Sequence, residues 1–170
     1  MEEPISVPPV KGVVPIDQPF GEDEEDIKLL QAMASEARNF LASFSWCNSI
    51  RDGYFGDGVG GVVAIFLFHI EPSSEDADEW LWVVVGDIPP AYLIVDDSPL
   101  PSLALEAYIE EMSKWVKLAK RGKYSSRVIP VDVPATPENA QLLEGRLTKL
   151  REWILPKFQE AESRRARLQL

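Results

Sequence analysis

Two runs of apolar residues constrain the fold more than any other feature of the sequence. Residues 62–68 read VVAIFLF and residues 80–85 read WLWVVV. We interpret both runs as strands, and successive side chains of a strand point to opposite faces of its sheet. Each run is therefore apolar on both faces, and both faces must be covered. We expect two central strands, with helices on one face and a tail, a long helix or another subunit on the other.

Weaker strand signals flank these two runs. Residues 46–55 read as an earlier strand, and Gly56-Asp57-Gly58 reads as the hairpin turn after it, because glycine tolerates positive φ. Residues 91–95 read as a fourth short strand, reached through the turn Gly86-Asp87-Ile88-Pro89-Pro90. Together the signals predict a four-stranded antiparallel meander.

Helical periodicity appears on both sides of the meander. Residues 24–44 carry apolar side chains at helical spacing, and a run of acids at 22–26 suits the positive end of a helix dipole. A second helix is expected after Ser98-Pro99, as N-cap and first turn, and ends near Gly122.

A last helix is expected from Thr136-Pro137, with Pro156 kinking or interrupting it. Residues 127–134, which contain two prolines, are expected to form an extended connector or an edge strand. The fold class is therefore α+β, with one helix before the meander and two helices after it.

The length of 170 residues suits a single domain. Residues 1–21 are expected to be an extended, proline-rich acidic tail, either disordered or laid along the body or a neighbouring subunit. Residues 22–160 are expected to form the single α+β domain. Residues 161–170 are expected to form a basic C-terminal tail.

The net charge of −11 disfavours nucleic acid and anionic membrane surfaces as partners and favours a basic protein. Cys47 is the only cysteine, which excludes an intramolecular disulfide and suits a reducing compartment. The N-terminal residues lack the apolar region of a secretory signal, and residues 59–70 are too short for a membrane helix. We expect a cytoplasmic protein.

Residues suited to catalysis are few. A hairpin centred near residue 57 would bring Cys47 opposite residues 67–69, and so near the single histidine, His69, although no local motif supports a nucleophile–base pair. The glycine-rich residues 56–61 lack the Lys-Ser/Thr of a phosphate-binding loop, and one cysteine with one histidine cannot form a structural zinc site. We expect no catalytic residue, no metal and no cofactor.

Carboxylates offer the alternative chemistry. Asp87, Asp96, Asp97 and Glu106 lie at strand ends or on the following helix and are candidates for a divalent-metal or hydrolase site. Antiparallel pairing, however, sends consecutive strand ends to opposite edges of a sheet. Turn and cap duties explain the aspartates equally well.

The turn after the second apolar run is the most distinctive stretch of the chain. Two prolines fix its backbone and Tyr92 adds an amphipathic ring, so it is a candidate interaction surface. The candidate contact residues are Asp87, Ile88, Pro89, Pro90 and Tyr92.

Residues 82–93, WVVVGDIPPAYL, followed by residues 104–109, ALEAYI, and Trp115-Val116, resemble a family of small uncharacterised bacterial proteins. Its members share a turn of the form W-V-(V/I)-x-G-D-(L/I)-P-x-x-Y and then a helix rich in alanine and aromatic residues. Residues 129–138 are also similar to some members. The resemblance covers about half of the chain. It implies a bacterial cytosolic setting and brings no activity, cofactor or catalytic residue with it.

These observations favour a non-catalytic protein-interaction module, such as an accessory subunit, an immunity-type inhibitor or a self-associating scaffold. Such a module would act through its acidic surface and its apolar sheet, on a protein partner or as a homo-oligomer. Two alternatives remain open: a carboxylate-based hydrolase, and a small-molecule sensor with a pocket between the sheet and the helix that carries Tyr108 and Trp115.

Overall fold

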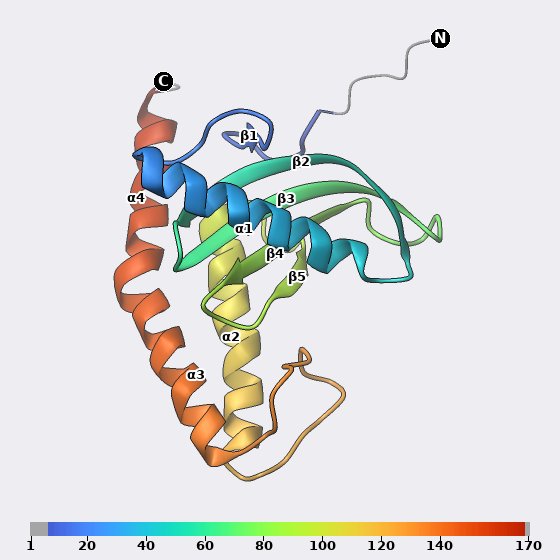
Figure 1. Ribbon diagram of the computed structural model, residues 1–170, viewed down its shortest axis with the longest axis vertical. Coiled ribbons are helices and arrows are strands. Elements are labelled where there is room, and N and C mark those ends of the chain that lie inside the picture. The colour runs from blue at the N-terminus through green and yellow to red at the C-terminus, as the bar shows by residue number, and fades with distance from the viewer. Residues whose placement is uncertain (1–6, 169–170) are drawn as a thin grey trace.

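A five-stranded antiparallel sheet forms the centre of the molecule, with helices on both of its faces (Figure 1). The structure, a computed structural model, describes residues 7–168. The strands follow the chain in the order β1-β2-β3-β4-β5. They are β1 (Val14–Pro15), β2 (Cys47–Val59), β3 (Val63–Pro72), β4 (Trp80–Gly86) and β5 (Ala91–Ile94). The α+β class and the antiparallel sheet are confirmed, and the expected four strands become five because β1 comes from the tail.

The helical segments are α1 (Glu24–Ala42), α2 (Pro101–Ala119), α3 (Pro137–Lys149), the π-helical turn η1 (Leu150–Ile154) and α4 (Leu155–Leu168). The last three follow one another without a gap and form one long rod along the side of the molecule (Figure 1). The two helices expected after the meander thus correspond to α2 and to this rod.

Both faces of the sheet are covered by this chain itself. Helix α1 packs on one face, where Leu30 and Leu41 meet Phe66 and Phe68 of β3. Helix α2 packs on the other face, and the rod formed by α3, η1 and α4 packs beside α2. Residues 63–70 of β3 are all buried. The described residues therefore complete the core without a second chain.

The segment before α1 lies along the edge of the sheet. Strand β1 pairs with β2, and the amide of Ile16 donates a hydrogen bond to the carbonyl of Gly53 at 3.0 Å. The ring of Phe20 stacks on Phe55 with 4.6 Å between centroids. Val10 is only 4% exposed and belongs to the core on the α2 side. Residues 10–20 are thus held by the body of the same chain.

The first hairpin turns later than predicted. Strand β2 continues through Gly56-Asp57-Gly58, and the turn lies at residues 60–62, where the amide of Val62 bonds to the carbonyl of Val59 at 3.0 Å. A Cβ at Gly56 would lie 2.9 Å from the carbonyl oxygen of Ile65. Glycine is needed at Gly56 for close packing within the sheet rather than for a turn.

This shift in register separates the one cysteine from the one histidine. Cys47 pairs with Pro72, and His69 pairs with Asp52. Cys47 belongs to the core under α1, whereas His69 stacks on Trp80, which packs against the other core. Burial also raises the pKa of the Cys47 thiol. The hairpin that would have brought Cys47 near His69 is therefore not the one that forms.

Pro156 interrupts the last helix as expected, through a π-helical turn just before it. The amide of Leu155 bonds to the carbonyl of Leu150, five residues back. Proline has no N–H to donate, and its ring clashes with the carbonyl four residues earlier in a regular helix. The wider π turn accommodates this conflict, and the rod continues beyond it.

Helix α2 begins at Pro101 rather than directly after Ser98-Pro99. Its N-cap, Leu100, offers no side-chain hydrogen bond. A carboxylate from α4 takes that role, because Glu162 accepts a hydrogen bond from the amide of Ser102 at 3.1 Å. Ser98 instead gives its carbonyl to the indole N–H of Trp82, at 2.7 Å.

Two valines near the N-terminus test whether this segment belongs to the folded core. We expect Val10→Ala to lower the free energy of unfolding by about 2 kcal/mol, because it removes two buried methyl groups and leaves a void. Val7 is 82% exposed, so Val7→Ala should change stability by less than about 0.5 kcal/mol. Urea unfolding followed by circular dichroism measures both. Equal effects of the two substitutions would contradict the docked position of Val10.

Candidate functional site

The turn between β4 and β5, residues 87–90, is held in place by hydrogen bonds to buried groups. It forms a ridge at the surface, and we use that name for these residues. Gly86 has a φ of 150°, and a Cβ there would collide with the carbonyl of Val62. The next amide, of Asp87, bonds to that carbonyl at 3.1 Å. Burial raises the pKa of Tyr108, so its hydroxyl stays protonated and donates to the carbonyl of Pro89 at 2.6 Å. The turn is thus a rigid support for surface contacts.

An apolar hollow of about 480 Å³ lies on one side of this ridge, and we call it the aromatic groove. Phe40 of helix α1 and Phe44 of the turn that follows it form one wall, and the loop between α2 and α3 forms the opposite wall. Asp132 is the only charged residue of its lining. The remaining residues are Pro89, Pro90, Ala91, Tyr92, Ile129, Pro130 and Val131.

Tyr92 is held in place by other aromatic rings. Its ring lies edge-on to Phe44 at 5.2 Å and to Trp46 at 5.0 Å. Phe44 and Trp46 stack on each other at 5.0 Å. Tyr92 nevertheless stays 39% exposed, so it offers a preorganised aromatic surface to solvent.

A hollow of about 430 Å³ adjoins the aromatic groove. Another hollow, of about 480 Å³, lies apart from both, beside α4. The adjoining one, the middle hollow, shares Pro89, Pro90, Val131 and Asp132 with the aromatic groove. Its lining includes two exposed apolar side chains, Leu142 at 61% and Val133 at 49%.

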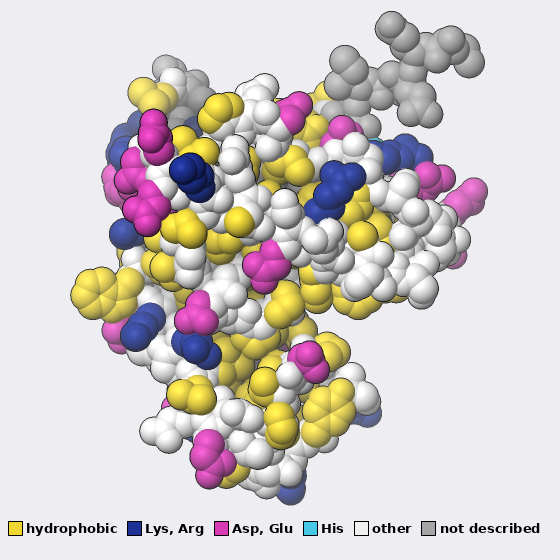
Figure 2. Space-filling model, viewed as in Figure 1, with side chains coloured by type: hydrophobic (Ala, Val, Ile, Leu, Met, Phe, Trp, Pro, Cys, Tyr) yellow, Lys and Arg dark blue, Asp and Glu magenta, His cyan; other side chains and the backbone are white. Residues whose placement is uncertain are grey.

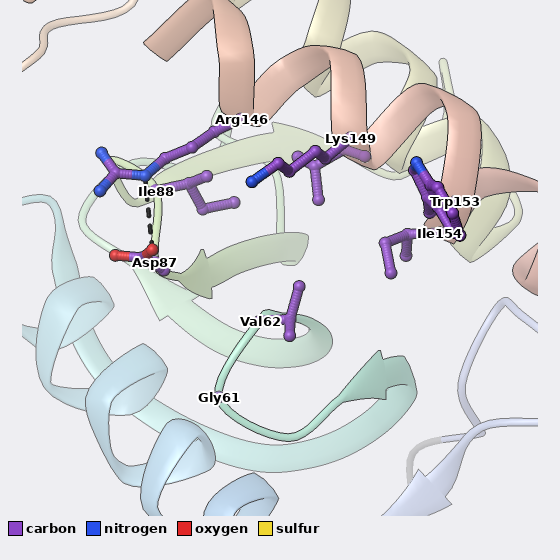
Figure 3. A pocket seen from close by; sticks show the side chains of 9 residues that line it. Gly61, Val62, Asp87, Ile88, Arg146, Lys149, Trp153 and Ile154 are labelled. Atoms are coloured by element: carbon purple, nitrogen blue, oxygen red, sulfur yellow. Dashed lines mark ion pairs between the residues drawn. The ribbon is translucent and has the colours of Figure 1, made fainter. Parts of the chain in front are cut away.

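A hollow of about 580 Å³ lies on the other side of the ridge, and we call it the basic hollow (Figure 3). Arg146 and Lys149 extend from α3 over Ile88 and Val62, and Trp153 stands at the far end on the π turn. Arg146 forms an ion pair with Asp87 at 3.4 Å. The hollow shares Asp87, Ile88 and Arg146 with the middle hollow.

The aromatic groove, the middle hollow and the basic hollow share lining residues and form one continuous surface around the turn, which we call the turn surface. Figure 2 shows this face narrowing between the sheet and the loop that joins α2 to α3, with hydrophobic side chains gathered in the narrowed part. Contiguous exposed apolar side chains mark interaction sites more often than scattered ones.

The turn residues singled out from the sequence all lie on this surface. Asp87 and Ile88 line the basic hollow, while Pro89, Pro90 and Tyr92 line the aromatic groove. The sequence reasoning did not identify the opposite walls. The sequence did contain a signal for the wall formed by Trp153. The helical spacing of Leu147, Leu150 and Ile154 predicts that these side chains point inward, and Trp153 does not fall on that face.

The candidate carboxylates do not line a common hollow. Asp87 pairs with Arg146, Asp96 and Asp97 lie exposed in the turn after β5, and Glu106 lines a groove beside Lys117 and Arg151. Within residues 7–168, no three His, Cys, Asp or Glu side chains are placed to hold a metal ion.

His69 is buried between two carboxylates. Its Nδ1 lies 3.7 Å from Asp52 and its Nε2 lies 3.4 Å from Glu79, and its ring stacks on Trp80 at 4.3 Å. None of the hollows described above includes His69 in its lining. The geometry suits a structural histidine better than a catalytic one.

Charged side chains also gather between β2 and α4, around Asp57. Burial raises the pKa of Asp57 to about 6, outweighing a 2.8 Å hydrogen bond from the amide of Gly58 and the attraction of Arg165. The carboxylates of Glu162 and Glu22 raise it further. The hollow beside Asp57 carries acids and bases together.

Comparison with family models, curated proteins and solved structures finds no match to the chain. The resemblance of residues 82–93 to a bacterial family therefore stays a prediction. Across residues 7–168, none of the helices combines the length and hydrophobicity that a membrane crossing requires.

The raised pKa of Asp57 predicts a pH-dependent stability. Its contribution is fully present below the ordinary value of 3.8 and is lost as the pH rises through about 6. At pH 8 the ionised carboxylate should cost up to about 3 kcal/mol. We expect Asp57→Asn to unfold at higher urea concentration than wild type at pH 8, with the difference disappearing near pH 4.

Asp76, exposed in the loop between β3 and β4, provides the matched control. Asp76→Asn should show no such difference between the two pH values. An Asp57→Asn protein no more stable than wild type at pH 8 would contradict the proposed cost of burying this carboxylate.

Proposed function

We propose that this protein is a non-catalytic interaction module that binds an extended apolar segment of a basic protein partner along the aromatic groove and the middle hollow of the turn surface. The observation that carries this proposal is the set of exposed apolar side chains on a rigid support. Tyr92, Val133 and Leu142 are exposed along two adjoining hollows, beside Pro89 and Pro90.

An extended segment suits the shape and chemistry of the aromatic groove. Grooves lined by aromatic side chains accept extended, proline-containing chains, which lose little conformational entropy on binding. The ridge is held by Tyr108 and by the carbonyl of Val62, so little rearrangement is needed. Preorganisation of this kind raises affinity by reducing the entropy cost of binding.

The charge of the chain favours a basic partner. The net charge is −11, and Asp132 lines both the aromatic groove and the middle hollow. A cation close to the apolar anchors of the partner segment would face this carboxylate. Complementary charge also speeds association and disfavours acidic competitors.

The apolar sheet no longer supports the proposal, because α1 and α2 cover its two faces. An accessory subunit or an immunity-type inhibitor would therefore bind through the turn surface. A self-associating scaffold would have to present an extended apolar segment of its own chain to the aromatic groove of a second copy. The hydrolase alternative has less support, since the four candidate carboxylates do not line a common hollow and Asp87 is paired with Arg146.

A peptide-display selection tests this proposal. We expect selection on the wild-type protein to enrich peptides that combine aromatic, aliphatic or proline residues with Lys or Arg. Leu142→Lys removes an exposed apolar contact and adds a charge that repels a basic segment, so it should weaken the enriched peptides about tenfold or more by fluorescence anisotropy.

Leu168, 86% exposed at the end of α4, provides the matched control. Leu168→Lys should leave peptide affinity unchanged, and both variants should keep the wild-type melting temperature. Failure to enrich any peptide that depends on Leu142 would count against the turn surface as a protein-binding site.

A further inference from the structure

We propose that the basic hollow is a separate site for a small planar aromatic anion, a flat ring system that carries a carboxylate or a phosphate. The proposal does not depend on the protein partner, because its deciding residues, Lys149 and Trp153, do not line the aromatic groove or the middle hollow.

Lys149 provides the charge for an anion. Figure 3 shows its side chain extending over the hollow toward Ile88, with Val62 below. Within residues 7–168, its ammonium has no carboxylate within 4.0 Å. In a chain with 28 acidic residues, an ammonium that faces an apolar hollow without an acidic partner is available for an external anion.

Arg146 can add a second contact. Its ion pair with Asp87 at 3.4 Å joins two side chains that are 46% and 74% exposed. Exposed ion pairs contribute little net free energy. The guanidinium can therefore turn toward a ligand at small cost, and its planar fork suits two oxygens of a carboxylate or phosphate.

Trp153 provides a stacking surface for the ring. It is 69% exposed, whereas the other four tryptophans are buried or half-buried. The π turn that carries it is of a kind that often occurs at functional sites. An indole face attracts flat aromatic groups, and an exposed tryptophan without a partner is uncommon on a soluble surface.

The floor and the size of the hollow fit the same ligand class. Val62, Ile88, Leu150 and Ile154 form an apolar lining between the cations and the indole. The hollow of about 580 Å³ lies within the range of small-molecule sites. Few polar groups over an apolar floor fix the orientation of a ligand rather than drive its reaction.

Two anions that share this chemistry test the site, adenosine 5′-monophosphate for a phosphate and 1-naphthoate for a carboxylate. Titration of the ¹⁵N-labelled full chain should shift the indole resonance of Trp153, assigned by its loss in Trp153→Phe. We expect at least one anion to bind with a dissociation constant of about 1 mM or tighter. Binding by one anion alone identifies the preferred acid group, and binding by both supports the shared chemistry.

Variants and neutral analogues show whether charge and stacking are responsible. Adenosine and 1-naphthalenemethanol should bind about tenfold more weakly than the corresponding anions, and Lys149→Gln should weaken the anions by a similar factor. Trp153→Ser lacks the reporting indole, so its binding is followed through the backbone amide resonances of the hollow, and it should be about tenfold weaker through lost stacking. Lys117→Gln, in the separate groove beside Glu106, should leave affinity unchanged.

The proposal is overturned if neither anion shifts the Trp153 resonance at 10 times the expected dissociation constant, about 10 mM. It is also overturned if the neutral analogues bind as well as the anions, or if Lys117→Gln weakens binding as much as Lys149→Gln. Peptides that depend on Leu142 should bind Lys149→Gln normally, so failure here is distinguishable from failure of the protein-binding proposal.

Discussion

Burial of β3 on both faces is the constraint from which the rest of the structure follows. Alternate side chains of this strand enter two separate cores, with Ile65 and Leu67 on one side and Phe66 and Phe68 on the other. Burial of each such side chain contributes roughly 1.5–3 kcal/mol relative to exposure. One layer of helices can cover only one core, so α1 and α2 must lie on opposite faces of the sheet.

The turn surface is a consequence of this arrangement. The two helical layers enclose the sheet, and the turn between β4 and β5 is held against α2 by the hydrogen bond from Tyr108 to Pro89. Phe40 at the end of α1 and Phe44 just after it reach the turn from one layer, and Arg146 of α3 reaches it from the other. The hollows form because these segments meet at the turn without closing over it (Figure 2).

Much of the fold could be predicted because local pattern and burial agree. The apolar strands, the helix starting at Glu24 and the interruption at Pro156 follow from periodicity and from the missing N–H of proline. The hairpin near residue 57 could not be placed, because a glycine selected for close packing looks like a glycine selected for a turn. Gly56 belongs to the first kind, and only its contact with Ile65 reveals this.

One part of the candidate site, the turn, could be predicted from the sequence, whereas the walls around it could not. The turn is continuous in sequence, so its prolines and Tyr92 could be recognised together. Its opposite walls come from α1, from the loop at 129–133 and from α3, which only the tertiary fold brings to the turn. Trp153 and Lys149 face the basic hollow for the same reason.

This chain alone covers both faces of its sheet, which leaves the turn surface free for binding. The concentration dependence of thermal unfolding tests it most directly, because a subunit that covered one face would stabilise the fold by mass action. We expect one unfolding midpoint across a hundredfold range of protein concentration. A midpoint that rises with concentration would show that association with a second copy stabilises the fold, and would contradict a core completed by one chain alone.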